Sequence, residues 1–283
     1  MRKRLPQWLQ NKHKKTQNII DTQKLLQSVE LDTVCRQARC PNRDECYGTG
    51  TATFLILGSR CTRSCAFCAV EHGEPRGLDE EEPQKLARAV RELELEHVVI
   101  TSVTRDDLPL GGARQFANCL KVLSGLERNI TTEVLTPDFQ FKKEALRLVV
   151  SQKPDIYNHN IETVPRLYSR VRPEADYERS LAVLEYIKEI NQKQKTKSGL
   201  MVGLGEEQAE VIAVMEDLRE IDCDFLTIGQ YLQPTNEHLP VEKFVKPEMF
   251  DRYEQWGKEL GFEYIKAGPL VRSSYQAEEM AKI

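Results

Sequence analysis

From residue 53 onward, short apolar or β-branched runs alternate with longer amphipathic stretches, and this rhythm limits the possible folds most. The runs that we predict to be strands are Thr53–Leu57, His97–Val103, Thr131–Leu135, Ile156–Ile161, Ser198–Gly203 and Phe225–Gln230. The stretches that we predict to be helices are Glu81–Leu95, Ala113–Leu126, Lys142–Val149, Tyr177–Asn191, Glu207–Asp222 and Pro247–Leu260, followed by a short extended piece at Glu263–Lys266. Strands that alternate with helices predict a mainly parallel sheet.

Six βα units are too few for a closed eight-stranded barrel, so the sequence predicts an α/β fold with a partial (β/α)6 barrel. We divide the chain into an N-terminal extension at residues 1–52, a barrel core at 53–246 and a C-terminal extension at 247–283. The N-terminal extension holds a helix with apolar residues from Ile19 to Val29 and then a loop at 35–52 that is rich in Arg, Pro, Asn and Gly.

In such folds the active site lies at the C-terminal ends of the strands. Polar and special residues gather at these ends in the sequence. They are Thr104–Asp107 and Gly111-Gly112, Thr136–Asp138, His159, Asn160 and Glu162, Gly205-Glu206, and Tyr231–Thr235. We therefore expect the functional groups among these residues and the cysteines that follow the first strand.

Six of the eight cysteines form two triplets of different spacing. The triplets are Cys35, Cys40 and Cys46, which read CxxxxCxxxxxC, and Cys61, Cys65 and Cys68, which read CxxxCxxC. The N-terminus lacks the apolar core and cleavage site of a secretory signal, so we expect a cytoplasmic protein whose cysteines bind metal rather than form disulfides. Three thiolates leave one iron of a 4Fe–4S cluster open for chemistry. Cys119 and Cys223 are expected to be structural.

Zinc and a set of buried or redox thiols are the alternatives for these cysteines. Zinc prefers four ligands, often from paired CxxC motifs, and only Cys65 and Cys68 have that spacing. The net charge of −4 and the absence of any apolar run near the ~18 residues of a membrane helix argue against nucleic-acid and membrane partners.

The CxxxCxxC triplet, with Phe67 before its last cysteine, resembles the radical S-adenosylmethionine superfamily. The resemblance implies that the cofactor chelates the open iron and that one electron releases a 5′-deoxyadenosyl radical. It also implies that Gly111-Gly112 meet the cofactor's amino group, although Ala113 stands where many members have Glu. Glu162 is a candidate to bind the ribose hydroxyls of the cofactor, and Arg172, with Arg170 nearby, is a candidate to bind the cofactor's carboxylate. The alternatives are a plain turn for the glycine pair, a solvated or helix-capping acid for Glu162, and surface charges for the two arginines.

Taken together, the motifs resemble the lipoyl synthase family over almost the whole chain. Besides the two triplets, the resemblance is carried by Arg39–Asn42, Thr104–Leu108, Tyr157–Thr163, Gly229–Thr235 and Arg272–Tyr275. It implies that the first triplet binds an auxiliary 4Fe–4S cluster whose coordination is completed by Ser274, or by Ser273 as the fallback. Without the resemblance, the two serines would be assigned to a polar turn near a chain end.

The resemblance implies radical insertion of two sulfur atoms at carbons six and eight of a protein-bound octanoyl-lysine. The auxiliary cluster would be the sulfur donor and S-adenosyl-L-methionine the second cofactor. The implied partners are octanoylated lipoyl carrier domains (glycine cleavage H protein and 2-oxoacid dehydrogenase E2 domains), an electron donor, and iron–sulfur assembly or carrier proteins. A sulfur-inserting enzyme similar to biotin synthase, and a non-catalytic iron–sulfur or zinc carrier, are the competing hypotheses. Biotin synthase would not need the first triplet, and a carrier would not need the βα array.

Overall fold

The computed structural model describes residues 4–10, 16–275 and 277, and these form two compact units. The first, called here the N-terminal unit, comprises residues 16–63 and 70–156. The second, the C-terminal unit, comprises residues 4–10, 64–69 and those from 157 onward. Strand β7 (Ile156–Asn158) begins at the last residue of one unit and continues into the other. Over the described ranges, no helix combines the length and the apolar character that crossing a membrane requires.

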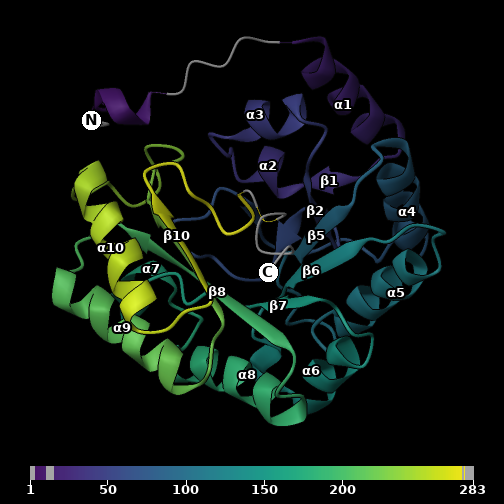
Figure 1. Ribbon diagram of the computed structural model, residues 1–283. Coiled ribbons are helices and arrows are strands. Elements are labelled where there is room, and N and C mark those ends of the chain that lie inside the picture. The colour runs from purple at the N-terminus through teal and green to yellow at the C-terminus, as the bar shows by residue number, and fades with distance from the viewer. Residues whose placement is uncertain (1–3, 11–15, 276, 278–283) are drawn as a thin grey trace. The chain divides into compact units, whose positions relative to one another are not determined.

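The sheet of the N-terminal unit has the strand order β1-β2-β5-β6 (Figure 1). Its strands are β1 (Asp32–Thr33), β2 (Thr53–Ile56), β5 (His97–Ser102) and β6 (Thr131–Leu135). Strands β2, β5 and β6 pair in parallel, with Thr53 beside Val99 and His97 beside Thr131, whereas β1 is antiparallel to β2. Most residues of β2, β5 and β6 are buried, and β2 and β5 are rich in apolar or β-branched residues, as is usual for parallel strands.

Three amphipathic helices cover one face of this sheet. They are α4 (Glu82–Glu92), α5 (Ala113–Ser124) and α6 (Lys143–Val150). Leu86, Phe116 and Leu146 are fully buried on these helices, as are Phe54 and Ile100 on the strands. Burial of apolar side chains at helical and strand spacing therefore holds the ends of β2, β5 and β6 in place.

The segment that carries the first cysteine triplet is more ordered than expected. The predicted helix around residues 19–29 is present as α1 (Gln17–Ser28). The prediction of a loop at 35–52 is wrong in part, because α2 (Val34–Gln37) and α3 (Arg43–Gly48) form there. Thr33 caps α2 by accepting a hydrogen bond from the Arg36 N–H, and two acidic residues in the first turn of α3 favour its N-terminus. Two helices this short give no clear sequence pattern.

The C-terminal unit has a second parallel sheet segment, in the order β8-β9-β10. Its elements are β8 (Lys195–Val202), β9 (Phe225–Gln230) and β10 (Tyr264–Gly268), with the helices α7 (Tyr168–Val171), α8 (Tyr177–Ile190), α9 (Gln208–Glu220) and α10 (Pro247–Glu259) and the short 3-10 helices η1 (Gln7–Leu9) and η3 (Pro165–Leu167).

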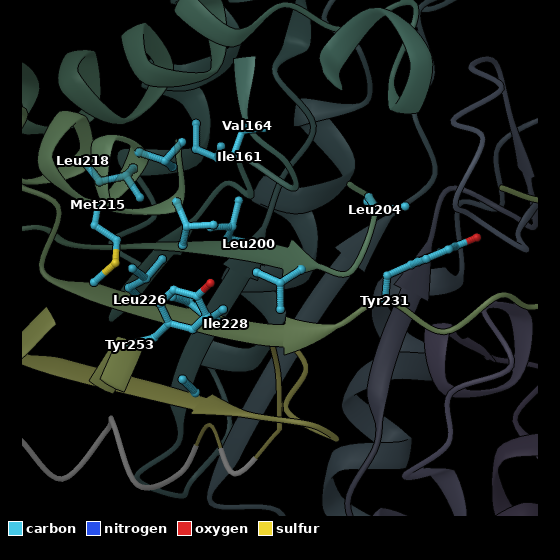
Figure 2. Packing of buried hydrophobic residues seen from close by; sticks show 14 of the residues in the cluster. Ile161, Val164, Leu200, Leu204, Met215, Leu218, Leu226, Ile228, Tyr231 and Tyr253 are labelled. Carbon is cyan, nitrogen blue, oxygen red and sulfur yellow. The ribbon is translucent and has the colours of Figure 1, made fainter. Parts of the chain in front are cut away.

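One apolar cluster joins the strands and helices of this unit (Figure 2). Leu200 of β8 and Leu226 and Ile228 of β9 belong to it, and so do Met215 and Leu218 of α9. All five side chains are at most 3% exposed. Because successive strand residues alternate between faces, the residues between them, such as Gly199 and Thr227, point to the opposite face, where the polar site residues of this unit lie.

All seven predicted extended segments and all six predicted helices of the βα array are present, with ends that differ by a few residues. The expected α/β class with a mainly parallel sheet is confirmed. The division at residues 52 and 246 stays a prediction. Of the basic N-terminal residues only Arg4 is described; Arg2, Lys3, Lys12, Lys14 and Lys15 lie outside the described residues.

Candidate functional site

Cys61 is fixed within the N-terminal unit. It lies on β3 (Arg60–Cys61), which pairs in parallel with β4 (Glu71–His72), and its carbonyl accepts the Gly73 N–H at 3.0 Å. Its sulfur accepts a hydrogen bond from the backbone N–H of Thr104 at 3.2 Å. Thr104 follows β5, so the first cysteine of CxxxCxxC is bound at a strand end of the parallel sheet, as predicted for the active region.

Cys65 and Cys68 are fixed within the C-terminal unit. The Cys68 N–H donates to the Cys65 carbonyl at 3.0 Å, which closes a tight turn. Between them, Ala66 donates its N–H to the Val171 carbonyl at 3.0 Å and accepts the Leu239 N–H at 3.2 Å. This turn is therefore held between the end of α7 and the segment that follows β9.

His238 also binds this turn, and sequence reasoning missed it. Its Nε2 lies 2.9 Å from the Cys68 carbonyl oxygen and its Nδ1 lies 2.7 Å from Thr235 Oγ1. A carbonyl oxygen only accepts, so Nε2 carries the proton, and in the neutral ring Nδ1 accepts from the Thr235 hydroxyl. The one sequence feature that could have pointed to His238 is its position, three residues after the end of the Gly229–Thr235 motif.

In the first cysteine triplet, Cys35 is buried and Cys40 and Cys46 are partly exposed. Cys35 on α2 is 5% exposed, and the Cys40 N–H donates to its carbonyl at 3.1 Å. Cys46 on α3 donates its N–H to the Asn42 carbonyl, and its own carbonyl accepts the Thr51 N–H at 2.8 Å. These hydrogen bonds span only a few residues each, and α3 is also bound to α1, where the Thr22 hydroxyl donates to the Tyr47 carbonyl at 2.9 Å.

The chemistry of these three sulfurs fits a positively charged iron cluster. Burial, with smaller contributions from neighbouring thiolate charge, raises the pKa of Cys35 to about 11 and that of Cys46 to about 12. Cys40 contributes to both shifts, so the three sulfurs are close enough to repel one another when ionised. Iron binds thiolates, and its positive charge offsets this repulsion. Among the described residues, no three Cys, His, Asp or Glu side chains lie close enough to ligate one single metal ion.

Gly111 and Gly112 are packed tightly at the start of α5. Both have positive φ, at 59° and 91°. A Cβ on Gly112 would lie 2.2 Å from Cδ1 of Leu57, and one on Gly111 would lie 2.9 Å from Cδ1 of Phe139. Packing and backbone conformation are by themselves enough to require glycine at both positions. The role of their backbone towards a cofactor remains a prediction.

The backbone of Leu57, whose side chain packs against Gly112, is held by two buried charged residues, of which Arg105 belongs to the predicted strand-end residues and Glu82 was not predicted. Both carboxylate oxygens of Glu82 accept the Leu57 N–H at 3.0 Å, and Arg105 donates to the Leu57 carbonyl at 3.3 Å. Burial raises the pKa of Glu82. This arrangement fixes the end of β2, just before the CxxxCxxC loop.

Glu162 and Arg172 come together in the C-terminal unit. Glu162 has a positive φ of 68°, and its backbone is held by Gly199 and Met201 of β8. Its Oε1 accepts a hydrogen bond from Asn160 at 3.0 Å. Burial raises the pKa of its carboxyl group, and the positive charge of Arg172 opposes this shift. A carboxylate held in this way is a suitable acceptor for hydroxyl groups.

Arg172 supports the backbone beside Glu162. Its Nη1 donates to the carbonyls of Asn160 and Ile161 at 3.0 and 3.3 Å, and its guanidinium lies 5.6 Å from the centre of the Tyr168 ring. Arg170, by contrast, forms an exposed ion pair with Glu242. Of the two arginines, only Arg172 is buried with the predicted site residues.

The first serine of the C-terminal motif is held by two hydrogen bonds. The hydroxyl of Ser273 donates to Oδ1 of Asn160 at 2.8 Å and accepts from Nδ2 of Asn158 at 3.1 Å. The motif is held close to β9, because a Cβ on Gly229 would lie 2.1 Å from the Val271 carbonyl oxygen. Ser273 therefore links this motif to the end of β7, whereas Ser274, the predicted ligand, is the next residue of the turn.

Cys119 and Cys223 are both fully buried, and Cys223 Sγ lies 3.5 Å from the Phe225 carbonyl oxygen. No disulfide is formed among the eight cysteines, all of which lie in the described part of the chain.

A family model described as the radical SAM superfamily matches residues 55–218. Lipoyl synthase from Caldanaerobacter subterraneus subsp. tengcongensis is 55% identical over 275 residues, which cover 97% of this chain and 96% of that protein. Lipoyl synthase from Aquifex aeolicus is 54% identical over 261 residues, which cover 92% and 95% of the two chains.

Two solved structures show the same fold at low identity. Streptococcus suis SuiB bound to S-adenosylmethionine has a TM-score of 0.61 and 13% identity, with 75% of this chain and 49% of SuiB covered. This chain thus spans about half the length of SuiB. Methylornithine synthase (PylB) has a TM-score of 0.55 and 14% identity, with 89% and 82% covered. At these identities the likeness describes the fold.

Proposed function

Because the chain belongs to the lipoyl synthase family of the radical SAM superfamily, we propose which of its residues carry the family's reaction. Its activity is radical-mediated insertion of two sulfur atoms into a protein-bound octanoyl group, at carbons six and eight of the chain. It uses two 4Fe–4S clusters and S-adenosyl-L-methionine, and the auxiliary cluster is the sulfur donor. When bound, these groups supply the radical and the sulfur.

Cys61, Cys65 and Cys68 hold the radical-generating cluster. The support is the anchoring of this loop: Cys61 is bound at the end of β5, and Cys65 and Cys68 form a hydrogen-bonded turn. The three cysteines have the superfamily's spacing within the matched region. Their role is to present three thiolates and leave the remaining iron to the cofactor.

Cys35, Cys40 and Cys46, completed by Ser274, hold the auxiliary cluster. The raised pKa values of Cys35 and Cys46, caused by burial and by neighbouring thiolate charge, support a common positively charged ligand. Ser274 is preferred to Ser273 by its position as the second serine of the Arg272–Tyr275 motif, which is the serine that the family resemblance implies. An alkoxide is a harder ligand than a thiolate, which suits an iron that is released when the cluster gives up sulfur.

Gly111, Gly112, Glu162 and Arg172 contribute to cofactor binding in different ways. The positive-φ glycines let the backbone approach a ligand closely. Glu162 accepts the ribose hydroxyls, and its carboxylate is oriented by Asn160. Arg172 donates hydrogen bonds from Nη1 to two backbone carbonyls, so it acts mainly by holding the Asn160–Glu162 segment.

The enzyme acts on a protein substrate. The proposed carriers are octanoylated lipoyl domains, such as the glycine cleavage H protein and the E2 domains of 2-oxoacid dehydrogenases. An electron donor must reduce the radical-generating cluster, and iron–sulfur assembly or carrier proteins must rebuild the consumed one. These requirements place the enzyme in the cytoplasm, where cysteines are kept reduced.

Anaerobic reconstitution followed by turnover with an octanoyl-lysine peptide tests these assignments. The protein should bind about eight irons per chain, which corresponds to two four-iron clusters. With S-adenosylmethionine and dithionite, it should form 5′-deoxyadenosine and the lipoyl peptide. About four irons, or 5′-deoxyadenosine without a sulfur-containing product, would contradict the two-cluster assignment.

A further inference from the structure

Arg63 lies within the CxxxCxxC motif, and its side chain is only 5% exposed. Nε and Nη2 donate to Asp106 at 2.7 and 3.0 Å, and Nη1 and Nη2 donate to Asp138 at 3.0 and 2.7 Å. The guanidinium thus makes two bidentate contacts at once, which fixes its orientation more strictly than a single ion pair does.

The two carboxylates that hold Arg63 stand on neighbouring strand ends of the N-terminal unit. Asp106 follows β5, and Asp138 follows β6, its parallel neighbour. The Asp138 side chain is fully buried and also accepts the Gln140 N–H at 2.9 Å, which fixes it at the start of η2 (Phe139–Phe141). Arg63 is therefore attached to a rigid part of the sheet.

A second set of hydrogen bonds lies beside this ion cluster. The Thr62 hydroxyl donates to the Thr104 carbonyl at 3.0 Å and accepts the Asp106 N–H at 3.1 Å. The Thr62 N–H also donates to the Thr104 carbonyl at 3.0 Å. These bonds align the two segments so that the Thr104 N–H points at the Cys61 sulfur, 3.2 Å away.

Stability alone does not explain a buried triad of this kind. Taking one guanidinium and two carboxylates out of water carries a desolvation penalty that their attraction often only balances. The triad also leaves one net negative charge next to a loop that is to hold thiolates. What the triad does supply is a defined geometry for residues 61–63.

We propose that Arg63 is a positioning residue for the radical-generating cluster. By binding Asp106 and Asp138, it keeps Cys61 where the Thr104 N–H donates to its sulfur. Hydrogen bonds to ligating sulfurs stabilise the reduced cluster and raise its potential. Arg63 therefore affects cluster retention and potential without touching substrate. This inference rests on the proposed assignment of Cys61 as a cluster ligand.

Arg63→Lys is the main test, because lysine keeps the charge but cannot bind two carboxylates in bidentate fashion. The full-length protein is reconstituted anaerobically, and its iron content, its electron paramagnetic resonance spectrum and the midpoint potential of the CxxxCxxC cluster are measured. We expect this cluster to bind about 10–100-fold more weakly, as for other supporting residues of metal sites. The fraction that remains should have a more negative potential and an altered spectrum.

The auxiliary cluster serves as an internal control. If Arg63 acts only on the CxxxCxxC loop, iron should fall from about eight towards about four per chain, with the auxiliary cluster retained. Arg166→Lys is the matched variant, because Arg166 makes a bidentate pair with Glu210 at 2.7 and 2.8 Å but is exposed and does not contact the cysteine loops in the hydrogen bonds described. It should leave both clusters and the potential unchanged.

Two further variants keep the test decisive if Arg63→Lys folds poorly. Asp106→Asn removes one charge from the more exposed carboxylate, and Thr62→Val removes only the hydroxyl beside Thr104. Both should shift the potential in the same direction by less. Unchanged potential, spectrum and iron content in all three variants would overturn the proposal. Equal loss of both clusters would also overturn it, because that result indicates a general folding role.

The wild-type protein separates this proposal from the functional assignment. If it fails to bind two clusters, the assignment of the cysteine triplets is wrong. If it binds both and the Arg63, Asp106 and Thr62 variants are indistinguishable from it, only the role of Arg63 is wrong.

Discussion

The two cysteine triplets are held by different kinds of structure. The hydrogen bonds around Cys35, Cys40 and Cys46 run to residues between Asn18 and Thr53, through helix α1, two small helices and turns. The CxxxCxxC loop is instead bound by residues far along the sequence, including Thr104, Val171 and His238. The first triplet is thus held within one continuous stretch of chain, and the residues that hold the second are far apart in the sequence.

This difference matches the different uses of the two clusters. A cluster that gives up its sulfur must be dismantled and rebuilt, and a locally held site can open without breaking the parallel sheet. A cluster that generates a radical must keep its geometry and potential through every turnover, which favours support from several rigid elements. The predictions below test this contrast, from the largest expected effect to the smallest.

Cys61→Ala should abolish both formation of 5′-deoxyadenosine and sulfur insertion, because two thiolates do not retain the radical-generating cluster. Iron should fall to about four per chain, and the remaining cluster should be the auxiliary one. Product analysis and iron determination on the reconstituted protein check this. Cys119→Ala is the matched control, because Cys119 is fully buried in α5 and should leave both clusters in place. Cofactor cleavage by Cys61→Ala would contradict the assignment.

Cys46→Ala should leave formation of 5′-deoxyadenosine intact and stop sulfur insertion. Since the hydrogen bonds of Cys46 run only to residues between Asn42 and Thr51, its loss should not disturb the hydrogen bonds that hold the CxxxCxxC loop. Counting 5′-deoxyadenosine and lipoyl peptide in the same reaction gives the two activities together. Loss of both activities would show that the first triplet also supports radical generation and that the proposed contrast is false.

The sequence alone predicted the elements that depend on local patterns. The alternation of apolar runs and amphipathic stretches predicted β5 and α9. A buried strand or a helix with one buried face needs apolar residues at regular spacing, and this spacing is visible in the sequence. The cysteine spacing indicated two clusters because ligand number is visible in the sequence. In both cases the physical cause and the visible pattern lie within a few residues.

What the sequence could not predict are contacts between distant residues. Arg63 reads as an exposed loop arginine, and nothing near it shows that Asp138, 75 positions away, will bind it. His238 and Cys68 are 170 positions apart. Helices α2 and α3 were missed for a different reason, because four and six residues are too few to show a period.

Ser274→Ala and Ser273→Ala distinguish the auxiliary ligand from its neighbour. Ser274→Ala should retain both clusters but lower lipoyl formation by about 10–100-fold, the usual cost of disturbing a metal site. Ser273→Ala removes the hydrogen bonds to Asn158 and Asn160. It should lower lipoyl formation only several-fold, because a typical hydrogen bond contributes about 1 kcal/mol. Single-turnover assays measure both. The reverse ranking would assign the ligand to Ser273.

The smallest effect is expected at His238, which touches the CxxxCxxC loop through a single backbone carbonyl. His238→Ala removes the donor to the Cys68 carbonyl, so the rate of 5′-deoxyadenosine formation should fall by roughly fivefold, corresponding to about 1 kcal/mol. His238→Gln restores a side-chain N–H donor and should recover part of the loss. Lipoyl formation should fall in the same proportion, because the auxiliary cluster is bound elsewhere in the sequence. A larger loss in sulfur insertion than in cofactor cleavage would show that His238 also supports the auxiliary site. The proposed contrast between the two cysteine triplets would then be wrong for this residue.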